Sequence, residues 1–171
     1  MHFIATFASC RKPFATISSI GMNKNVYIAV SSDHAGFELK AEILTWLKAQ
    51  SYKNVTDLGA YNNDSVDYPD FGAKMGEVIT LGKAEIGIVV CGSGIGISIA
   101  ANRFPAVRCA LCHSAGTAKL GRAHNDANVL AMGSRIIDVP TAIETLEAFL
   151  TTDFDGGDRH IRRRNKLGEI T

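Results

Sequence analysis

The sequence lacks the features that mark membrane proteins and disulfide-bonded proteins. No apolar run in its 171 residues approaches the roughly 20 needed to span a bilayer, so we expect a soluble protein. Four cysteines without the spacing of a disulfide framework favour a reducing compartment, with the cytoplasm as the default. The formal net charge of +1 provides no overall attraction to nucleic acid or to an anionic membrane. An apolar fraction of 46% is still enough to bury the core of one domain.

Acidic residues are absent from the N-terminal segment, where the first carboxylate is Asp33. Residues 1–21 instead carry basic and hydroxyl side chains, as an organellar transit peptide does. A start codon placed too far upstream is the simpler explanation, because Met22 directly precedes the first predicted strand. We therefore predict a disordered leader over residues 1–21 and one domain with a basic tail over residues 22–171. An organellar location would follow only from a genuine transit peptide.

From residue 25 onward, strand-like and helix-like segments alternate. Apolar, β-branched runs predict strands over residues 26–30, 54–58, 86–90, 107–111 and 129–132. Helical spacing predicts helices over residues 37–50, 68–81, 94–102 and 115–123, and from Pro140. Strands that alternate with helices form a parallel sheet covered on both faces. The prediction is an α/β fold, a Rossmann-like three-layer α/β/α sandwich with a five-stranded parallel sheet.

Ligands of such sheets bind beyond the carboxyl ends of the strands, where the strand order reverses. Polar residues accompany three of the predicted strands: residues 33–34 follow the first, residues 91–96 follow the third, and residues 124–126 precede the fifth. We expect one edge of the sheet to gather all three segments. The alternatives are that Asp33 caps the next helix and that His124 belongs to an ordinary loop.

The glycine-rich segment Cys91-Gly-Ser-Gly-Ile-Gly96 lies between a predicted strand and a helix N-terminus. Such a turn exposes backbone N–H groups, which stabilise a phosphate or a developing oxyanion. The helix dipole would favour a thiolate at Cys91 and make it a base or a nucleophile, whereas the alternative is a buried structural cysteine. The segment is neither a dinucleotide fingerprint, because Ile97 replaces the third glycine, nor a phosphate loop, because no Gly-Lys-Ser/Thr follows.

Residues 109–113, Cys-Ala-Leu-Cys-His, match the pattern of covalent haem attachment. Residues three apart on a strand point to opposite faces, so Cys109 and Cys112 cannot both reach one haem. No second pair of ligands stands at the spacing of a zinc site. We therefore expect Cys109 and Cys112 to be packing residues at the end of a strand.

The C-terminal residues 158–166 are densely basic. If they are helical, Arg159 and Arg163 share a face and together can clamp a phosphate. A solvated tail is the alternative. Nucleic-acid binding is disfavoured because no aromatic residues are interleaved with these charges.

Six segments of the chain together resemble the B-type ribose-5-phosphate isomerases, in a superfamily that also contains the galactose-6-phosphate isomerase subunits. They are residues 33–37 (DHAGF), 67–70 (DYPD), 91–103 (CGSGIGISIAANR), 124–126 (HND), 133–135 (GSR) and 156–160 (GGDRH). The resemblance implies an aldose–ketose isomerase that interconverts ribose 5-phosphate and ribulose 5-phosphate without metal or cofactor. It also implies a homodimer, or a dimer of dimers, with active sites shared between subunits.

The resemblance further implies catalytic roles for individual residues. Cys91 matches the base of a cysteine subgroup, while Ile97 replaces the glutamate that another subgroup uses. Ser93 matches a hydroxyl that assists the base, and His124 matches the imidazole that opens the furanose ring. Asp33 matches the side chain that handles the sugar hydroxyls.

The implied substrate-binding residues fall into three groups. The anion hole consists of backbone amides from Gly92, Gly94, Ile95 and Gly96. Asn125 matches a side chain that steadies the intermediate, and Tyr68 one that lines the pocket. The phosphate ligands are His34, Arg135, Arg159 and Arg163; His124, Asn125 and Arg135 are expected to reach across to the other subunit.

One departure from the family pattern and two other functions remain open. Asp158 stands between the glycine pair and Arg159, where the family pattern has Gly-Gly-Arg-His, which leaves the register of the tail contacts open. The same machinery would serve a hexose phosphate such as allose or galactose 6-phosphate. A catalytically silent sugar-phosphate or nucleotide-binding module is the third reading, although a mere binder does not need Cys91, Ser93 and His124 together.

Overall fold

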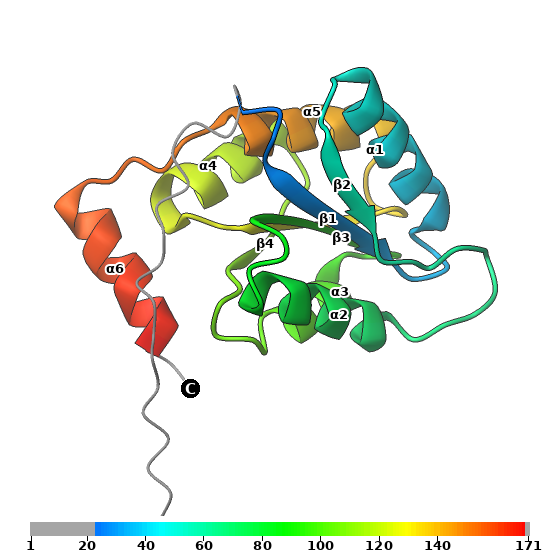
Figure 1. Ribbon diagram of the computed structural model, residues 1–171, viewed down its shortest axis with the longest axis horizontal. Coiled ribbons are helices and arrows are strands. Elements are labelled where there is room, and N and C mark those ends of the chain that lie inside the picture. Colours follow the sequence, from blue (N-terminus) through cyan, green and yellow to red (C-terminus); the bar gives the residue numbers. More distant parts are fainter. Residues whose placement is uncertain (1–22, 170–171) are drawn as a thin grey trace, which may run out of the picture.

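The computed structural model describes residues 23–169, so the predicted leader over residues 1–21 lies outside the described residues. Strands and helices alternate along the described chain, and a sixth helix follows (Figure 1). The elements are β1 (Tyr27–Ser32), α1 (Phe37–Ala49), β2 (Asn54–Asp57), α2 (Tyr68–Thr80), β3 (Ile86–Cys91), α3 (Ile95–Ala101), β4 (Cys109–Leu111), α4 (Ala115–Asn125), β5 (Val129–Gly133), α5 (Val139–Thr151) and α6 (Asp158–Glu169).

The five strands form one sheet in the order β2-β1-β3-β5-β4, and every pair is parallel. The chain adds β2 on one side of β1 and then returns to add β3 on the other side. The strand order therefore reverses between β1 and β3. This switch point is where an open α/β sheet leaves a crevice for a ligand.

Alternate side chains of β3 enter two separate cores, because successive residues of a strand point to opposite faces. Ile86, Ile88 and Val90 pack on the side of α1, α4 and α5. Val89 and Cys91 pack on the side of α2 and α3. Figure 1 shows these two helical layers above and below the sheet. The predicted three-layer α/β/α fold is confirmed.

The two cysteines of the haem-like pattern separate as expected. Cys109 belongs to the core beneath α2 and α3, whereas Cys112 belongs to the core beneath α1, α4 and α5. Burial raises the pKa of both thiols. A pair of protonated thiols on opposite faces of a sheet cannot attach one haem.

The basic tail is a helix, which is the condition for Arg159 and Arg163 to share a face. Helix α6 stands outside the three layers and packs against α4 (Figure 1). Its buried side chains are His160 and Arg164, while Arg159 and Arg163 are exposed one turn apart.

Within residues 23–169, no helix is long and apolar enough to cross a membrane.

Two boundaries differ from the predictions for physical reasons. Strand β4 begins at Cys109 instead of residue 107, because the backbone N–H of Arg108 donates to the side chain of Asn128 at 2.8 Å. Helix α4 continues to Asn125 and ends where Asp126 adopts a left-handed conformation with φ 48°. His124 and Asn125 are therefore the last helical residues and do not belong to a loop.

Candidate active site

The segment after β1 fixes two polar side chains at the switch point. The Oδ1 atom of Asp33 accepts a hydrogen bond of 2.9 Å from the backbone N–H of Gly36, directly before α1. Nδ1 of His34 lies 3.2 Å from both the backbone nitrogen and the carbonyl oxygen of Val66. The N-cap of α1 is Gly36, so Asp33 is not the capping residue considered as an alternative; it holds the turn before the helix and also lines a cavity.

The glycine-rich loop after β3 wraps around the sulfur of Cys91. The backbone N–H of Gly94 points at Sγ with a nitrogen–sulfur distance of 3.1 Å, and only 3% of Cys91 is exposed. Gly94 has a φ of 77°, and a Cβ atom there would lie 2.6 Å from Leu111. Glycine is therefore required at this position. The Ser93 hydroxyl accepts a bond of 3.2 Å from the N–H of Ile95, in the first turn of α3.

The segment after β5 closes the third side of this region. The backbone N–H of Ser134 donates to the carbonyl of Cys91 at 2.9 Å, and its hydroxyl donates to the carbonyl of Ala35 at 2.8 Å. Ser134 thereby joins the segments after β1 and β3, a role that the sequence interpretation missed. Its place at the carboxyl end of a predicted strand was the available signal.

These three segments enclose a cavity of about 590 Å³, a volume typical of small-molecule sites. Nine of the predicted site residues line it: Asp33, His34, Tyr68, Cys91, Gly92, Ser93, Ile95, Gly96 and Arg135. Gly94 shapes the loop from behind and is not part of the lining. Ala35, Ile99 and Ile136 complete the wall and were not predicted.

Two side chains that line this cavity lie over glycines of the loop after β3. The ring of Tyr68 rests on Gly96, where an added Cβ atom would lie 2.5 Å from ring carbon Cε2. The guanidinium of Arg135 extends over Gly92, with Nη1 3.3 Å from the position of a Cβ there. The expectation that Arg135 reaches across to another subunit thus differs from the structure, which places it beside Cys91 of its own chain.

Apart from Gly94, the other predicted site residues lie at the opposite edge of the sheet, so the expectation of one shared edge is wrong. His124 and Asn125 precede Val129, which pairs with Gly87 at the start of β3, whereas Gly133 pairs with Cys91 at its end. The four residue steps from Val129 to Gly133, about 13 Å at 3.3 Å per residue, therefore separate them from the Cys91 loop. Both side chains are exposed.

Helix α6 lies beside this second group and brings Arg159 with it. The rings of His124 and His160 stack with centroids 4.7 Å apart and an interplanar angle of 14°. Arg159 Nη2 lies 3.4 Å from Nε2 of His160. In Figure 1, α6 stands at one end of the molecule, beyond α4, which it contacts. The chain thus carries two separate sets of the predicted residues, one at each sheet edge.

A buried carboxylate anchors this second set. Asp126 is fully buried and contacts Arg122 at 3.0 Å, Arg108 at 3.2 Å and Arg164 at 3.3 Å. Burial lowers the pKa of Arg108 to about 10 and also lowers that of Arg122, and in both cases the charge of Asp126 opposes the shift. With a pKa of about 10, Arg108 stays charged near pH 7. Asp126 joins α4, α6 and the segment just before β4.

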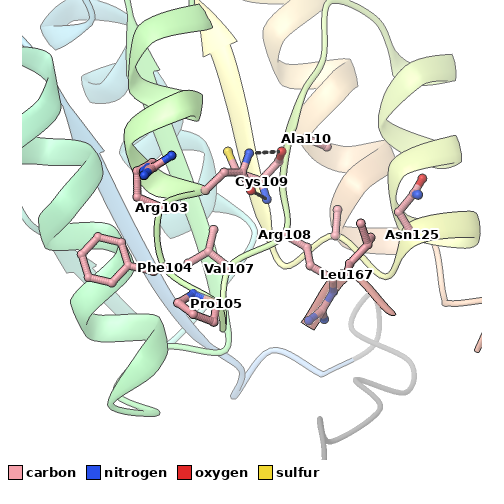
Figure 2. A pocket seen from close by; sticks show the side chains of 11 residues that line it. Arg103, Phe104, Pro105, Val107, Arg108, Cys109, Ala110, Asn125 and Leu167 are labelled. Atoms are coloured by element: carbon pink, nitrogen blue, oxygen red, sulfur yellow. Dashed lines mark hydrogen bonds between the residues drawn. The ribbon is translucent and has the colours of Figure 1, made fainter. Parts of the chain in front are cut away.

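A second and larger cavity, of about 650 Å³, also lies at the amino edge (Figure 2). It is lined mainly by the connection from α3 to β4, and Asn125 is the only predicted site residue on its wall. Its thiol, Cys109, has a pKa raised by burial and is thus protonated. The smaller cavity, which holds Cys91, is the better candidate for chemistry.

The chain resembles known proteins over most of its length. A family model described as Ribose/Galactose Isomerase matches residues 28–167. Ribose-5-phosphate isomerase B of Escherichia coli is 40% identical over 143 residues, which cover 84% of this chain and 95% of that protein.

Two solved structures share both the fold and much of the sequence. Ribose-5-phosphate isomerase B of Clostridium thermocellum superposes with a TM-score of 0.82 at 46% identity, covering 85% of this chain and 97% of that one. A ribose 5-phosphate isomerase of Thermotoga maritima gives a TM-score of 0.81 at 45% identity, covering 85% and 99%. The chain therefore belongs to the ribose/galactose isomerase family.

Proposed function

We propose that this protein interconverts ribose 5-phosphate and ribulose 5-phosphate through an enediolate, with Cys91 as the base. The observation that carries the proposal is the cavity at the switch point, where a thiol, a carboxylate and a glycine-rich helix start converge. The named activities of the E. coli, C. thermocellum and T. maritima relatives support it.

The reaction needs an acid for ring opening, a base for the proton next to the carbonyl, and donors for the enediolate. His124 opens the furanose ring, and Cys91 then moves the proton from C2 of the aldehyde form to C1. Ser93 assists the base, and Asp33 holds the sugar hydroxyls. The amides of residues 92–96 and the side chain of Asn125 stabilise the negative oxygen.

Binding of the phosphate positions the sugar and excludes water. His34 and Arg135 are ligands from the chain that supplies Cys91, because they line the same cavity. Arg159 and Arg163 add two further positive charges from α6, and Tyr68 encloses the sugar from the side of α2.

The active site is shared between two copies of the chain. The set that lies away from Cys91, at the opposite edge of the sheet, contains His124, Asn125 and Arg159. Within one chain, neither this set nor the set around Cys91 makes a complete active site. A symmetric dimer can place the exposed His124 of one copy over the Cys91 cavity of the other. Exposed isoleucines on α3, Ile95 at 53% and Ile99 at 60%, supply apolar surface beside the cavity for such a contact.

The experiment that tests this function is the ratio of kcat/KM on ribose 5-phosphate to that on allose 6-phosphate. We expect turnover of both and a ratio above one, because the same base serves either sugar and only the distance to the phosphate differs. A ratio below one would make the hexose phosphate the better substrate. If neither sugar were turned over, the remaining interpretation would be a non-catalytic sugar-phosphate-binding module.

Replacing Arg159 or Arg163 by alanine should weaken binding of the substrate and of inorganic phosphate together. The expected increase in KM and in the phosphate inhibition constant is roughly ten- to a hundredfold, as for the loss of a hydrogen bond to a charged group. Arg162→Ala is the matched control, because Arg162 is an exposed arginine on the same helix. Unchanged phosphate inhibition in both variants would return α6 to the reading of a solvated tail.

The same variants test the shared site. At substrate concentrations well below the parental KM, where both separate variants are nearly inactive, refolding a mixture of Cys91→Ala and Arg159→Ala chains should restore about a quarter of the parental activity. Half of the dimers are then mixed, and one of their two sites is intact. Activity that stays at the level of the separate variants would place both residues in one chain's site.

A further inference from the structure

The proposed ring-opening acid, His124, has an exposed side chain at the very end of a helix. A residue in this position has many orientations available in solution, whereas a catalytic proton donor must point at the ring oxygen of the sugar. The ring of His160, from α6, lies flat against the ring of His124 at 4.7 Å. Stacked aromatic pairs contribute beyond the burial of their area and fix the ring plane.

His160 itself is held firmly, unlike His124. It is 6% exposed, and its Nδ1 lies 3.2 Å from the carbonyl oxygen of His124. A carbonyl only accepts, so Nδ1 carries the hydrogen in this bond. A guanidinium only donates, so Nε2 accepts from Arg159 across 3.4 Å. One neutral tautomer, with its hydrogen on Nδ1, satisfies both bonds.

The remaining neighbours keep His160 in place. The backbone N–H of His160 donates to the carbonyl of Gly157 at 2.8 Å. Asp155 Oδ2, 3.5 Å from Nε2, pairs with the ring only when the ring is protonated. One turn further along α6, Arg164 is tied to the buried Asp126. His160 is therefore a fixed surface between α4 and α6 against which the exposed ring of His124 rests.

We propose that His160 is a positioning residue that orients the His124 ring for the ring-opening step, through the stack between the two imidazoles. The inference rests on the proposed function of this site. It predicts that His160 matters for a cyclic substrate and much less for an acyclic one. A residue that only stabilised the fold would affect both substrates alike.

The two sides of the reaction supply such a pair of substrates. Ribose 5-phosphate closes a ring through O4 and must be opened before its C2 proton can be removed. Ribulose 5-phosphate has its carbonyl at C2 and its O5 blocked by phosphate, so it is acyclic. Deuterium uptake at C1 of ribulose 5-phosphate in heavy water thus reports proton transfer without ring opening.

Two substitutions separate the stack from the hydrogen bond. His160→Asn places an amide nitrogen where Nδ1 stood and keeps the donor to His124 but removes the ring. His160→Phe keeps the ring and removes the donor. We expect His160→Asn to slow conversion of ribose 5-phosphate by about three- to tenfold, as fits a stacked pair. His160→Phe should remain closer to the parent, and deuterium uptake from ribulose 5-phosphate should stay within about twofold in both.

Two variants are controls. His124→Asn shows how much the conversion of ribose 5-phosphate slows when the proposed acid is removed entirely, and His113→Phe changes an exposed histidine outside the site. Melting temperatures identify a variant that is merely unfolded. If one His160 variant does not fold, the other still allows deuterium uptake from ribulose 5-phosphate to be compared with conversion of ribose 5-phosphate. Equal losses of conversion and uptake, full activity in His160→Asn, or a greater loss in His160→Phe would each overturn the inference. A parent enzyme that fails to convert ribose 5-phosphate would instead refute the proposed function.

Discussion

Replacing Cys91 by alanine should abolish exchange of the substrate's C–H proton with solvent, while the substrate still binds within a factor of a few. The thiol lines the cavity that also holds Asp33 and the glycine-rich loop, whereas the proposed phosphate ligands are other residues. Loss of a general base costs about 10²- to 10⁴-fold. Deuterium uptake from heavy water is the measurement, because it reports proton removal directly and not product release.

The other described cysteines are matched controls for this experiment. Cys109 and Cys112 belong to the two cores of the sheet, and burial raises the pKa of each thiol. Their replacement by alanine should cost stability at most and leave deuterium uptake unchanged. Uptake near the parental rate in Cys91→Ala would show that another group is the base, and the proposed mechanism would fail at its central step.

The sequence was enough to predict the fold and one half of the candidate site. Buried parallel strands give continuous apolar runs, and β3 shows this most clearly, since all six of its residues are buried. The rule that ligands bind at the carboxyl ends of strands then led to Asp33 and Cys91, and both line the cavity at the switch point.

The same rule failed for His124 and Asn125 because it was applied to residues on the wrong side of a strand. In a parallel sheet, residues that follow a strand and residues that precede one lie at opposite edges. Arg135 follows β5 and accordingly lies beside Cys91, whereas His124 precedes β5 and lies away from it. Whether a residue precedes or follows the strand in the sequence was therefore enough to tell at which edge of the sheet it lies.

The position of α6 could not be predicted, because it depends on contacts between residues distant in the sequence. Arg164 meets Asp126 across 38 positions, and His160 meets His124 across 36. A run of exposed basic residues gives no sign that one of its members, Arg164, is buried. The carboxylate that pairs with Arg164 is Asp126, which the sequence interpretation considered only as part of the motif at residues 124–126. In the structure it contacts three buried arginines.

Replacing Asp126 by asparagine should therefore have the largest effect on stability. The substitution leaves Arg108, Arg122 and Arg164 buried without their common counter-charge, with side chains at most 9% exposed. Removing one partner of a buried ion pair typically costs about 3–5 kcal/mol, because the remaining charge stays uncompensated. The free energy of unfolding in urea is the measurement, and high salt should change the loss little, since buried pairs are weakly screened.

Two further variants show whether uncompensated charge is the cause of this loss. Asp138→Asn changes another hydrogen-bonded aspartate, which is exposed and caps α5, and should leave the unfolding midpoint unchanged because asparagine caps equally well. Adding Arg122→Met to Asp126→Asn should recover part of the stability, because it removes one of the three buried charges at nearly constant volume. If the double variant is less stable than Asp126→Asn by the full cost of Arg122→Met alone, the two residues do not interact. Asp126 would then act through its shape and its left-handed backbone, not as the counter-charge that holds α6 and His124 in place.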